Sequence, residues 1–242
     1  FFYAPDTHNA LHISGHHHFS SFKNLNAAVR NHLEKAQSTP VIFLDALDTK
    51  GENYPNFKAL RELPLAEIIL VVDDSHGIGI IGHEGNGVYQ SLIKLQPKEL
   101  IVCCSLGKGF GIQAGAIFAT KQRISTFRNT DFFGGASPAS PAALAVLPEA
   151  ENIFEKKRAL LQQHIQLLVR QVDTISQLTF VPNHPVFSFT NTTLAEHLKA
   201  HQILITNFNY PTKNASLMSR IVLSAQHTKE DITCLADTIN KL

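Results

Sequence analysis

Two short apolar runs constrain the fold of this chain more than any other feature. The first, Ile68–Val72, is followed by Asp73, and the second, Leu100–Cys104, is followed by Ser105. Both runs are rich in β-branched residues and end at glycine or charge, which is typical of strands buried on both faces in a parallel sheet. Open α/β sheets bind ligands beyond the carboxyl ends of their strands. We therefore expect the polar residues after the two runs to meet at one edge of a sheet.

The residues that follow the two runs have side chains suited to one kind of chemistry. They are Asp73, His76, Ser105 and Lys108. In a partly desolvated pocket a lysine has a lowered pKa, so Lys108 could act as a neutral nucleophile. Such an amine forms Schiff bases with carbonyl compounds, including pyridoxal phosphate (PLP). Asp73 could be the carboxylate that keeps the pyridine nitrogen protonated. His76 could hydrogen-bond the ring hydroxyl, and Ser105 with nearby backbone N–H groups could hold the phosphate.

Three motifs in this region and near the end of the chain resemble one family. Val72–Gly79 followed by Gly82–Gly87 is similar to V-D-E-A-H-G-x-G…G-x-x-G-x-G, and Ser105–Gly115 is similar to T-x-G-K-A-x-G-x-x-G-G. Pro211–Thr212 and Arg220–Thr228 are similar to P-P-T followed by R-L-R-x-x-L-x-A-x-H-T. In this order the motifs resemble the α-oxoamine synthases. These are PLP enzymes of fold type I that include glycine C-acetyltransferase and amino-oxononanoate synthase.

The resemblance implies an α/β fold with two domains. The large PLP-binding domain would have a mostly parallel sheet between helices, and a small α+β domain would follow it. We place the boundary near Pro148, so residues 1–148 form part of the large domain and residues 149–242 form the small one. The hydrophobic pattern predicts a helix over Asn24–Ala36 capped by Asn24, a strand over Pro40–Asp45, a short helix over Asn56–Leu63, a strand over Ala114–Ala119, a helical segment over Ser140–Ser176 broken at Pro148, strands over Pro185–Thr190, Ile203–Phe208 and Ser219–Ser224, and helices over Thr193–Ala200 and Lys229–Leu242.

The resemblance also implies a reaction, the condensation of an amino acid with an acyl-CoA. Lys108 would hold PLP as an aldimine and later remove a proton from the substrate, while His76 would orient the ring oxygen. Asp73 and Ser105 would bind the cofactor with these two residues. Arg220 would grip the substrate carboxylate, for which its bidentate fork is suited.

Two alternatives remain open at the level of sequence. Aminotransferases of the same fold share the aspartate and the lysine, so a PLP-dependent aminotransferase is the first. The second is a catalytically degenerate family member that acts as a dimer partner. Asp45–Pro55 and the Gly134–Gly135 loop, which depart from the family pattern, favour this second alternative, and the retained Lys108 argues against it.

The composition excludes several other classes of protein. The 242 residues carry a net charge of +1, which gives no reason to expect a nucleic-acid or membrane-surface partner. No apolar run approaches the length of a membrane span. The three cysteines are an odd number, and Cys103 and Cys104, adjacent in a strand, point to opposite sides. We therefore expect no metal site and a reducing cytoplasm.

Two expectations concern the rest of the protein. Family sites are built across a two-fold interface, so we expect a homodimer. In the family a substantial amino-terminal portion precedes the part matched here, so we expect this chain to be a fragment of a longer one.

Asp74 with His83 and Glu84 could form a metal site, but these residues lack regular metal-ligand spacing.

Overall fold

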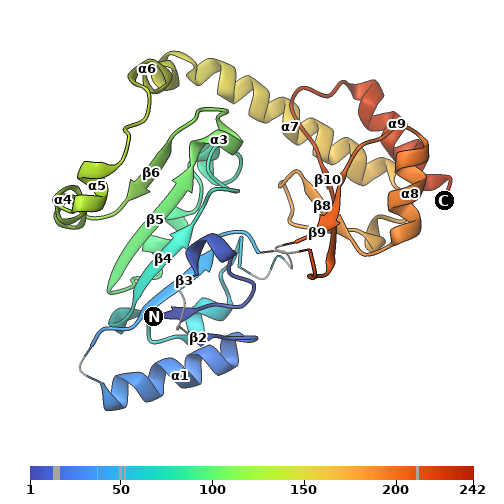
Figure 1. The fold of residues 1–242 in the computed structure, drawn as a ribbon. Helices are drawn as coiled ribbons and strands as arrows, with labels where there is room; N and C mark the ends of the chain where they lie inside the picture. The colour runs from blue at the N-terminus through green and yellow to red at the C-terminus, as the bar shows by residue number, and fades with distance from the viewer. Residues whose placement is uncertain (13–16, 37, 49–50, 52, 211–212) are drawn as a thin grey trace. The chain divides into compact units, whose positions relative to one another are not determined.

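The computed structural model describes most of the chain as two compact units, residues 1–151 and 152–242 (Figure 1). The described residues are 1–12, 17–36, 38–48, 51, 53–210 and 213–242. Among them, no helix is both long enough and apolar enough to cross a membrane. The assignment of a cofactor domain to residues 1–148 and of a small domain to residues 149–242 stays a prediction.

Unit 1 is built on a six-stranded sheet. Its strands are β1 (Phe2–Tyr3), β2 (His17–His18), β3 (Val41–Asp45), β4 (Ile69–Asp73), β5 (Glu99–Ser105) and β6 (Gly115–Phe118). They follow the order β2-β1-β3-β4-β5-β6, and every neighbouring pair is parallel except β5 and β6. Figure 1 shows β3 to β6 side by side. The two apolar runs therefore form neighbouring parallel strands, as the sequence predicts, in an α/β fold of the expected kind.

Burial of the central strands is less complete than the sequence pattern suggests. In β3 and β4, alternate residues are fully buried, among them Ile42, Leu44, Leu70 and Val72, while their neighbours are half-buried. Only β5 has a continuous buried stretch, from Leu100 to Val102. Of the two runs expected to be buried on both faces, the expectation is thus wrong for β4 in this chain. Each fully buried aliphatic side chain contributes roughly 1.5–3 kcal/mol, so the buried face of this sheet stabilises unit 1 together with the rest of its core.

Helix α1 (Phe22–Lys35) joins the same hydrophobic core. Leu25 and Val29, four residues apart, lie on its buried face and are fully covered. The predicted cap at Asn24 is wrong. Ser21 is extended and its hydroxyl accepts a hydrogen bond from the Asn24 N–H at 3.3 Å, so the helix begins one turn earlier.

The remaining helical segments of unit 1 are short. They are η1 (Asn9–Leu11), η2 (Ala59–Glu62), η3 (Leu65–Glu67), η4 (His83–Gly85), α2 (Tyr89–Ile93), α3 (Leu106–Gly109), α4 (Lys121–Arg128), α5 (Asp131–Gly135) and α6 (Pro141–Glu149). The helix predicted over Asn56–Leu63 is only the four-residue 3-10 turn η2. Pro148 lies inside α6, so the predicted break falls at Ala150 instead.

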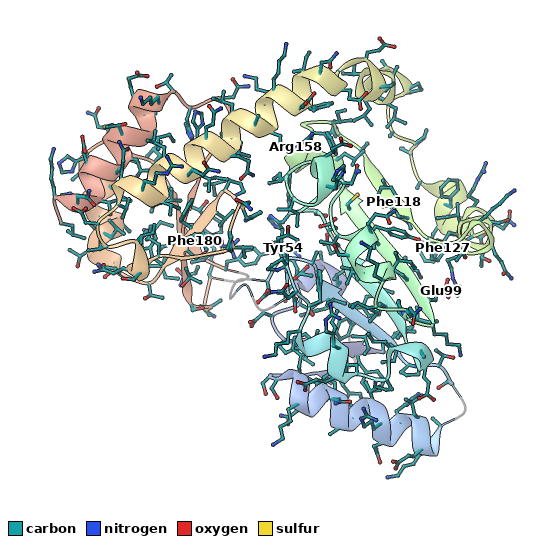
Figure 2. The ribbon with its side chains drawn as sticks, turned by 180° about the vertical axis from the view of Figure 1, so that it is seen from behind. Tyr54, Glu99, Phe118, Phe127, Arg158 and Phe180 are labelled. Carbon is teal, nitrogen blue, oxygen red and sulfur yellow. The ribbon has the colours of Figure 1, made fainter. Side chains whose placement is uncertain are left out.

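Helices α4, α5 and α6 are unusual because none of their residues is buried. Large apolar side chains on these helices and on β6 are exposed, namely Ile117, Phe118, Phe132, Phe133, Leu144 and Val146. One polar contact fixes α4 to the sheet. Arg123 donates two hydrogen bonds of 2.6 Å to the carboxylate of Glu99, the first residue of β5. Figure 2 labels Glu99 and the neighbouring Phe127, whose ring lies 5.9 Å from the Arg123 guanidinium.

Unit 2 is a small α+β structure. Its elements are α7 (Glu151–Gln171), η5 (Ile175–Gln177), β7 (Thr179–Phe180), β8 (Val186–Phe189), α8 (Thr192–Ala200), β9 (Thr206–Asn209), β10 (Leu217–Val222) and α9 (Lys229–Asn240). The strands form an antiparallel sheet in the order β7-β8-β10-β9. Leu161, Ile165 and Leu168 of α7 supply part of its core, with spacings of three and four residues.

Candidate active site

The carboxyl ends of three parallel strands meet at one edge of the unit 1 sheet. Asp73 at the end of β4 is the register partner of Asp45 at the end of β3 and of Cys103 in β5. Main-chain hydrogen bonds continue the pairing past the strands, from Ala46 N–H to the Asp73 carbonyl and from Asp74 N–H to the Cys103 carbonyl, both at 2.8 Å. This edge is the place where an open α/β sheet binds ligands.

Ser75 joins the two predicted halves of the site. Its N–H donates a hydrogen bond to Asp73 Oδ1 at 2.8 Å, and its hydroxyl oxygen accepts one from Ser105 N–H at 2.8 Å. The Ser105 hydroxyl in turn accepts a hydrogen bond from Gly107 N–H at 3.2 Å and caps the single turn of α3. Residues 30 positions apart in the sequence are therefore held together at the strand edge.

Lys108 and His76 contact each other across the same edge. Lys108 Nζ lies 2.9 Å from His76 Nε2, within hydrogen-bonding distance. One of the two nitrogens must donate a proton and the other must accept it, so an ammonium at Lys108 requires an unprotonated Nε2. His76 is half-buried, but Lys108 is exposed. The described residues therefore do not form the partly desolvated pocket that we expected around this lysine.

Asp45 belongs to this edge although sequence reasoning gave it no role. Its pKa is raised from 3.8 to about 7, mainly by burial and also by the charge of the neighbouring Asp73. The His8 N–H, which donates to Asp45 Oδ2 at 2.7 Å, and the charge of Lys108 act in the opposite direction. The available signal was positional, because Asp45 ends a predicted strand in the same way as Asp73.

The turn that carries Lys108 packs closely against the loop after β4. Gly79 has a φ of +83°, and a side chain there would meet the backbone of Gly109. A side chain at Gly109 would collide with the carbonyl oxygen of Ile78. The two backbones approach this closely only because both residues are glycines.

Arg220 is the one predicted site residue in unit 2. It lies in β10, a central strand, opposite Ser188 of β8 and Thr206 of β9. Burial lowers the pKa of its guanidinium, while Tyr210 acts in the opposite direction. Its substrate role stays a prediction, and the neighbouring Pro211–Thr212 motif lies outside the described residues.

The metal alternative has no support in the described parts of the chain. Asp74 is buried, whereas the side chains of His83 and Glu84 are exposed and lie 3.6 Å from each other. Within the residues that the structure describes, no three His, Cys, Asp or Glu side chains form a group that could hold a metal ion.

The family is decided by a match to the aminotransferase class I and II family over residues 19–239. The chain belongs to this family. Within it, the 8-amino-7-oxononanoate synthase of Buchnera aphidicola subsp. Baizongia pistaciae is 31% identical over 189 residues, which cover 72% of this chain and 47% of that protein. The relatives thus support membership among the α-oxoamine synthases, which the three sequence motifs predict. The chain spans about half the length of the curated relatives that it matches, 47% in this case.

Solved structures of family members share the fold. The 8-amino-7-oxononanoate synthase of Francisella tularensis matches with a TM-score of 0.70 and 21% identity, covering 99% of this chain and 74% of that chain. A serine palmitoyltransferase from S. paucimobilis, solved with a bound PLP–myriocin adduct, matches with a TM-score of 0.73 and 15% identity, covering 99% and 65%. The fold class predicted from the sequence, that of fold-type I PLP transferases, is confirmed.

Proposed function

We propose that this chain carries the cofactor-binding edge of a PLP-dependent transferase that condenses an amino acid with an acyl-CoA. The observation that carries the proposal is the 2.9 Å contact between Lys108 Nζ and His76 Nε2, at the strand edge that also holds Asp73. Family membership supports the proposal, because the α-oxoamine synthases carry an aspartate, a histidine and a lysine in this order.

The residues present fit PLP in the chemistry of their side chains. Lys108 offers an exposed amine, Asp73 a carboxylate, and Ser105 a hydroxyl beside the backbone N–H groups of a tight turn. PLP, when bound, withdraws electrons from the α-carbon of an amino acid and so stabilises the negative charge that develops there. Asp73 would hold the pyridinium N–H. Because the pKa of Asp45 is about 7, the Asp45 carboxyl group can stay neutral. The Asp73 carboxylate would then be the one negative charge that faces the positively charged pyridinium.

The chain's own residues would position and move protons. The Lys108 amine would take the proton from the substrate α-carbon, for which it must be neutral. In that state Lys108 Nζ can donate an N–H to an unprotonated His76 Nε2, which holds the amine in place and leaves its lone pair free for the substrate proton, since the two atoms are already 2.9 Å apart. Arg220 would bind the substrate carboxylate. Its half-buried guanidinium favours a charged partner, because burial without one is costly.

An aminotransferase remains the first alternative, since aminotransferases of the same fold also have an aspartate and a lysine at the positions of Asp73 and Lys108. A degenerate dimer partner is the second, and the retained contact between Lys108 and His76 argues against it. A homodimer and a cytoplasmic location remain predictions that accompany the proposal.

The test is an absorption spectrum of the full-length protein with added PLP, before and after borohydride. We expect a visible band and, after reduction, a covalent adduct on Lys108. Lys108→Ala should abolish both, whereas Lys94→Ala, which removes another exposed lysine, should leave them unchanged. Amino acids would then be screened with acyl-CoAs and, separately, with 2-oxo acids, to distinguish condensation from amino-group transfer. A folded wild-type protein with no band contradicts the proposal.

A further inference from the structure

Asp74, the neighbour of the cofactor aspartate, is a buried carboxyl group that the proposed reaction does not use. Only 1% of the residue is exposed. Its Oδ2 accepts a hydrogen bond of 2.9 Å from Val88 N–H, 14 residues further along the chain. Its Oδ1 is buried and has no hydrogen-bond partner among the described residues. Burying a carboxyl group with only one hydrogen-bond donor costs folding free energy, so its place in the structure calls for an explanation.

The loop of residues 74–88 is folded around this carboxyl group. A side chain at Gly77 would collide with Asp74 Oδ1, and one at Gly87 would collide with Oδ2. The Asp74 carbonyl also accepts hydrogen bonds of 3.0 Å from the N–H groups of Gly77 and Ile78. Asp74 therefore contacts both the beginning and the end of the loop.

The same loop forms one side of the active site. It carries His76, whose Nε2 contacts Lys108 Nζ. At Gly79 it packs against Gly109, the residue after Lys108. Asp74 is also tied to β5, the strand that leads to Lys108, through the 2.8 Å hydrogen bond from its N–H to the Cys103 carbonyl. A change in the closure of the loop would therefore move His76 relative to the Lys108 amine.

We propose that Asp74 is a positioning residue for this site, whose carboxyl group closes the 74–88 loop on Val88 and so holds His76 against Lys108. The positioning rests on the contacts above. Its effect on catalysis rests on the proposed function.

The closed loop is compatible with a neutral carboxyl group. The pKa of Asp74 is raised to about 7, mainly by burial and also by the charge of Asp73, against the lowering effect of the hydrogen bond from Val88 N–H. The titratable groups that influence it are Asp73 on β4 and Cys104 on β5, and burial raises the pKa of the Cys104 thiol to about 11. Around neutral pH the charge state of Asp74 therefore changes before that of Cys104. Ionisation of Asp74 should loosen the loop, because the new charge has one N–H donor and a neighbouring carboxylate.

Two substitutions separate the effect of the Asp74 hydrogen-bond acceptor from the effect of its ionisation. Asp74→Asn keeps an oxygen for Val88 N–H and stays neutral at every pH, whereas Asp74→Leu keeps the approximate volume and removes the acceptor. Asp237→Asn, an exposed carboxylate on α9, is the control. Amide hydrogen exchange of Val88, measured without PLP, should be about tenfold faster in Asp74→Leu, which corresponds to the loss of one hydrogen bond, and nearly unchanged in Asp74→Asn.

The second readout is the dependence of the reaction on pH with PLP bound. We expect Asp74→Leu to lower kcat about tenfold or more with little change in KM, because His76 is misplaced by a small distance. In Asp74→Asn the decline of kcat that starts near pH 7 should disappear. The proposal is overturned if the Val88 amide of a folded Asp74→Leu variant exchanges at the wild-type rate. It is also overturned if the dependence of kcat on pH is the same in Asp74→Asn as in the wild type. If Asp74→Leu does not fold, the Asp74→Asn profile decides. If the wild type shows no PLP chemistry, the proposed function fails and Val88 exchange still tests the positioning.

Discussion

Replacement of Asp45 by asparagine should change how the stability of unit 1 depends on pH. In the folded chain the pKa of Asp45 is raised from 3.8 to about 7, mainly by burial. The folded state therefore binds a proton that the unfolded state has lost between these two values. The Asp45 contribution is fully present below about pH 4 and is lost as the pH rises through about 7.

The magnitude follows from the same two pKa values. At 1.36 kcal/mol per pH unit, a rise from 3.8 to about 7 corresponds to roughly 4 kcal/mol of unfolding free energy lost across this range. Asp45→Asn cannot ionise, yet its side-chain oxygen can still accept the hydrogen bond from His8 N–H. The variant should therefore lack this part of the decline. Asp74 contributes a decline of the same sign, so the wild-type slope is not abolished completely.

Urea unfolding at a series of pH values from 4 to 8 measures this effect. Tyrosine fluorescence is a suitable signal, since the chain has no tryptophan and three of its four tyrosines, Tyr3, Tyr54 and Tyr89, lie in unit 1. Asp237→Asn should reproduce the wild-type curve. Equal pH slopes in the wild type and Asp45→Asn would refute the reasoning, because they would mean that Asp45 titrates alike in the folded and unfolded chains.

Three other changes test the packing around the site and the cores. Gly109→Ala should destabilise unit 1 by about 1–3 kcal/mol in thermal unfolding, because the new side chain collides with the facing backbone, whereas Gly134→Ala, which has no neighbour within 4 Å, should be nearly neutral. Glu99→Gln should cost about 1 kcal/mol by removing the carboxylate that pairs with Arg123. Because this pair lowers the pKa of Glu99 from 4.5, the cost should vanish as the pH falls through the lowered pKa, and a difference that persists in strong acid contradicts this. Leu168→Ala in the core of unit 2 should cost about 2–5 kcal/mol in urea unfolding, and a loss below 1 kcal/mol would show that the site tolerates the cavity.

The central sheet could be predicted because its signal is local and repeated. Ile68–Val72 and Leu100–Cys104 are short β-branched runs with polar ends, so both the strands and the edge at which the carboxyl ends of β4 and β5 meet follow from the sequence. The 2.9 Å contact between His76 and Lys108 forms because the segments that follow the two strands meet at this edge. Parallel strands place their carboxyl ends together whatever the length of the intervening loop.

Other features depended on contacts that the sequence does not encode locally. Ser21 outcompetes Asn24 as a cap because it adopts the extended conformation one turn earlier. Asp74 reads as a polar loop residue, and only the close approach of Gly77 and Gly87 reveals that it is buried. Lys108 was expected in a partly desolvated pocket, but on the single turn of α3 its side chain is exposed. Such environments are set by residues distant in the sequence.

The exposed apolar side chains of α4, α5, α6 and β6 have a practical consequence for work with this chain. Phe132 is 92% exposed, and Phe133 and Val146 are about half exposed. Exposed aromatic and aliphatic side chains of this kind bind hydrophobic dyes and adhere to phenyl resins. Sulfate strengthens apolar association because it is excluded from protein surfaces, so the chain should elute late from hydrophobic-interaction columns and precipitate at low ammonium sulfate. Phe132→Ser, which changes a side chain without a core role, should shorten the retention and leave the thermal stability intact.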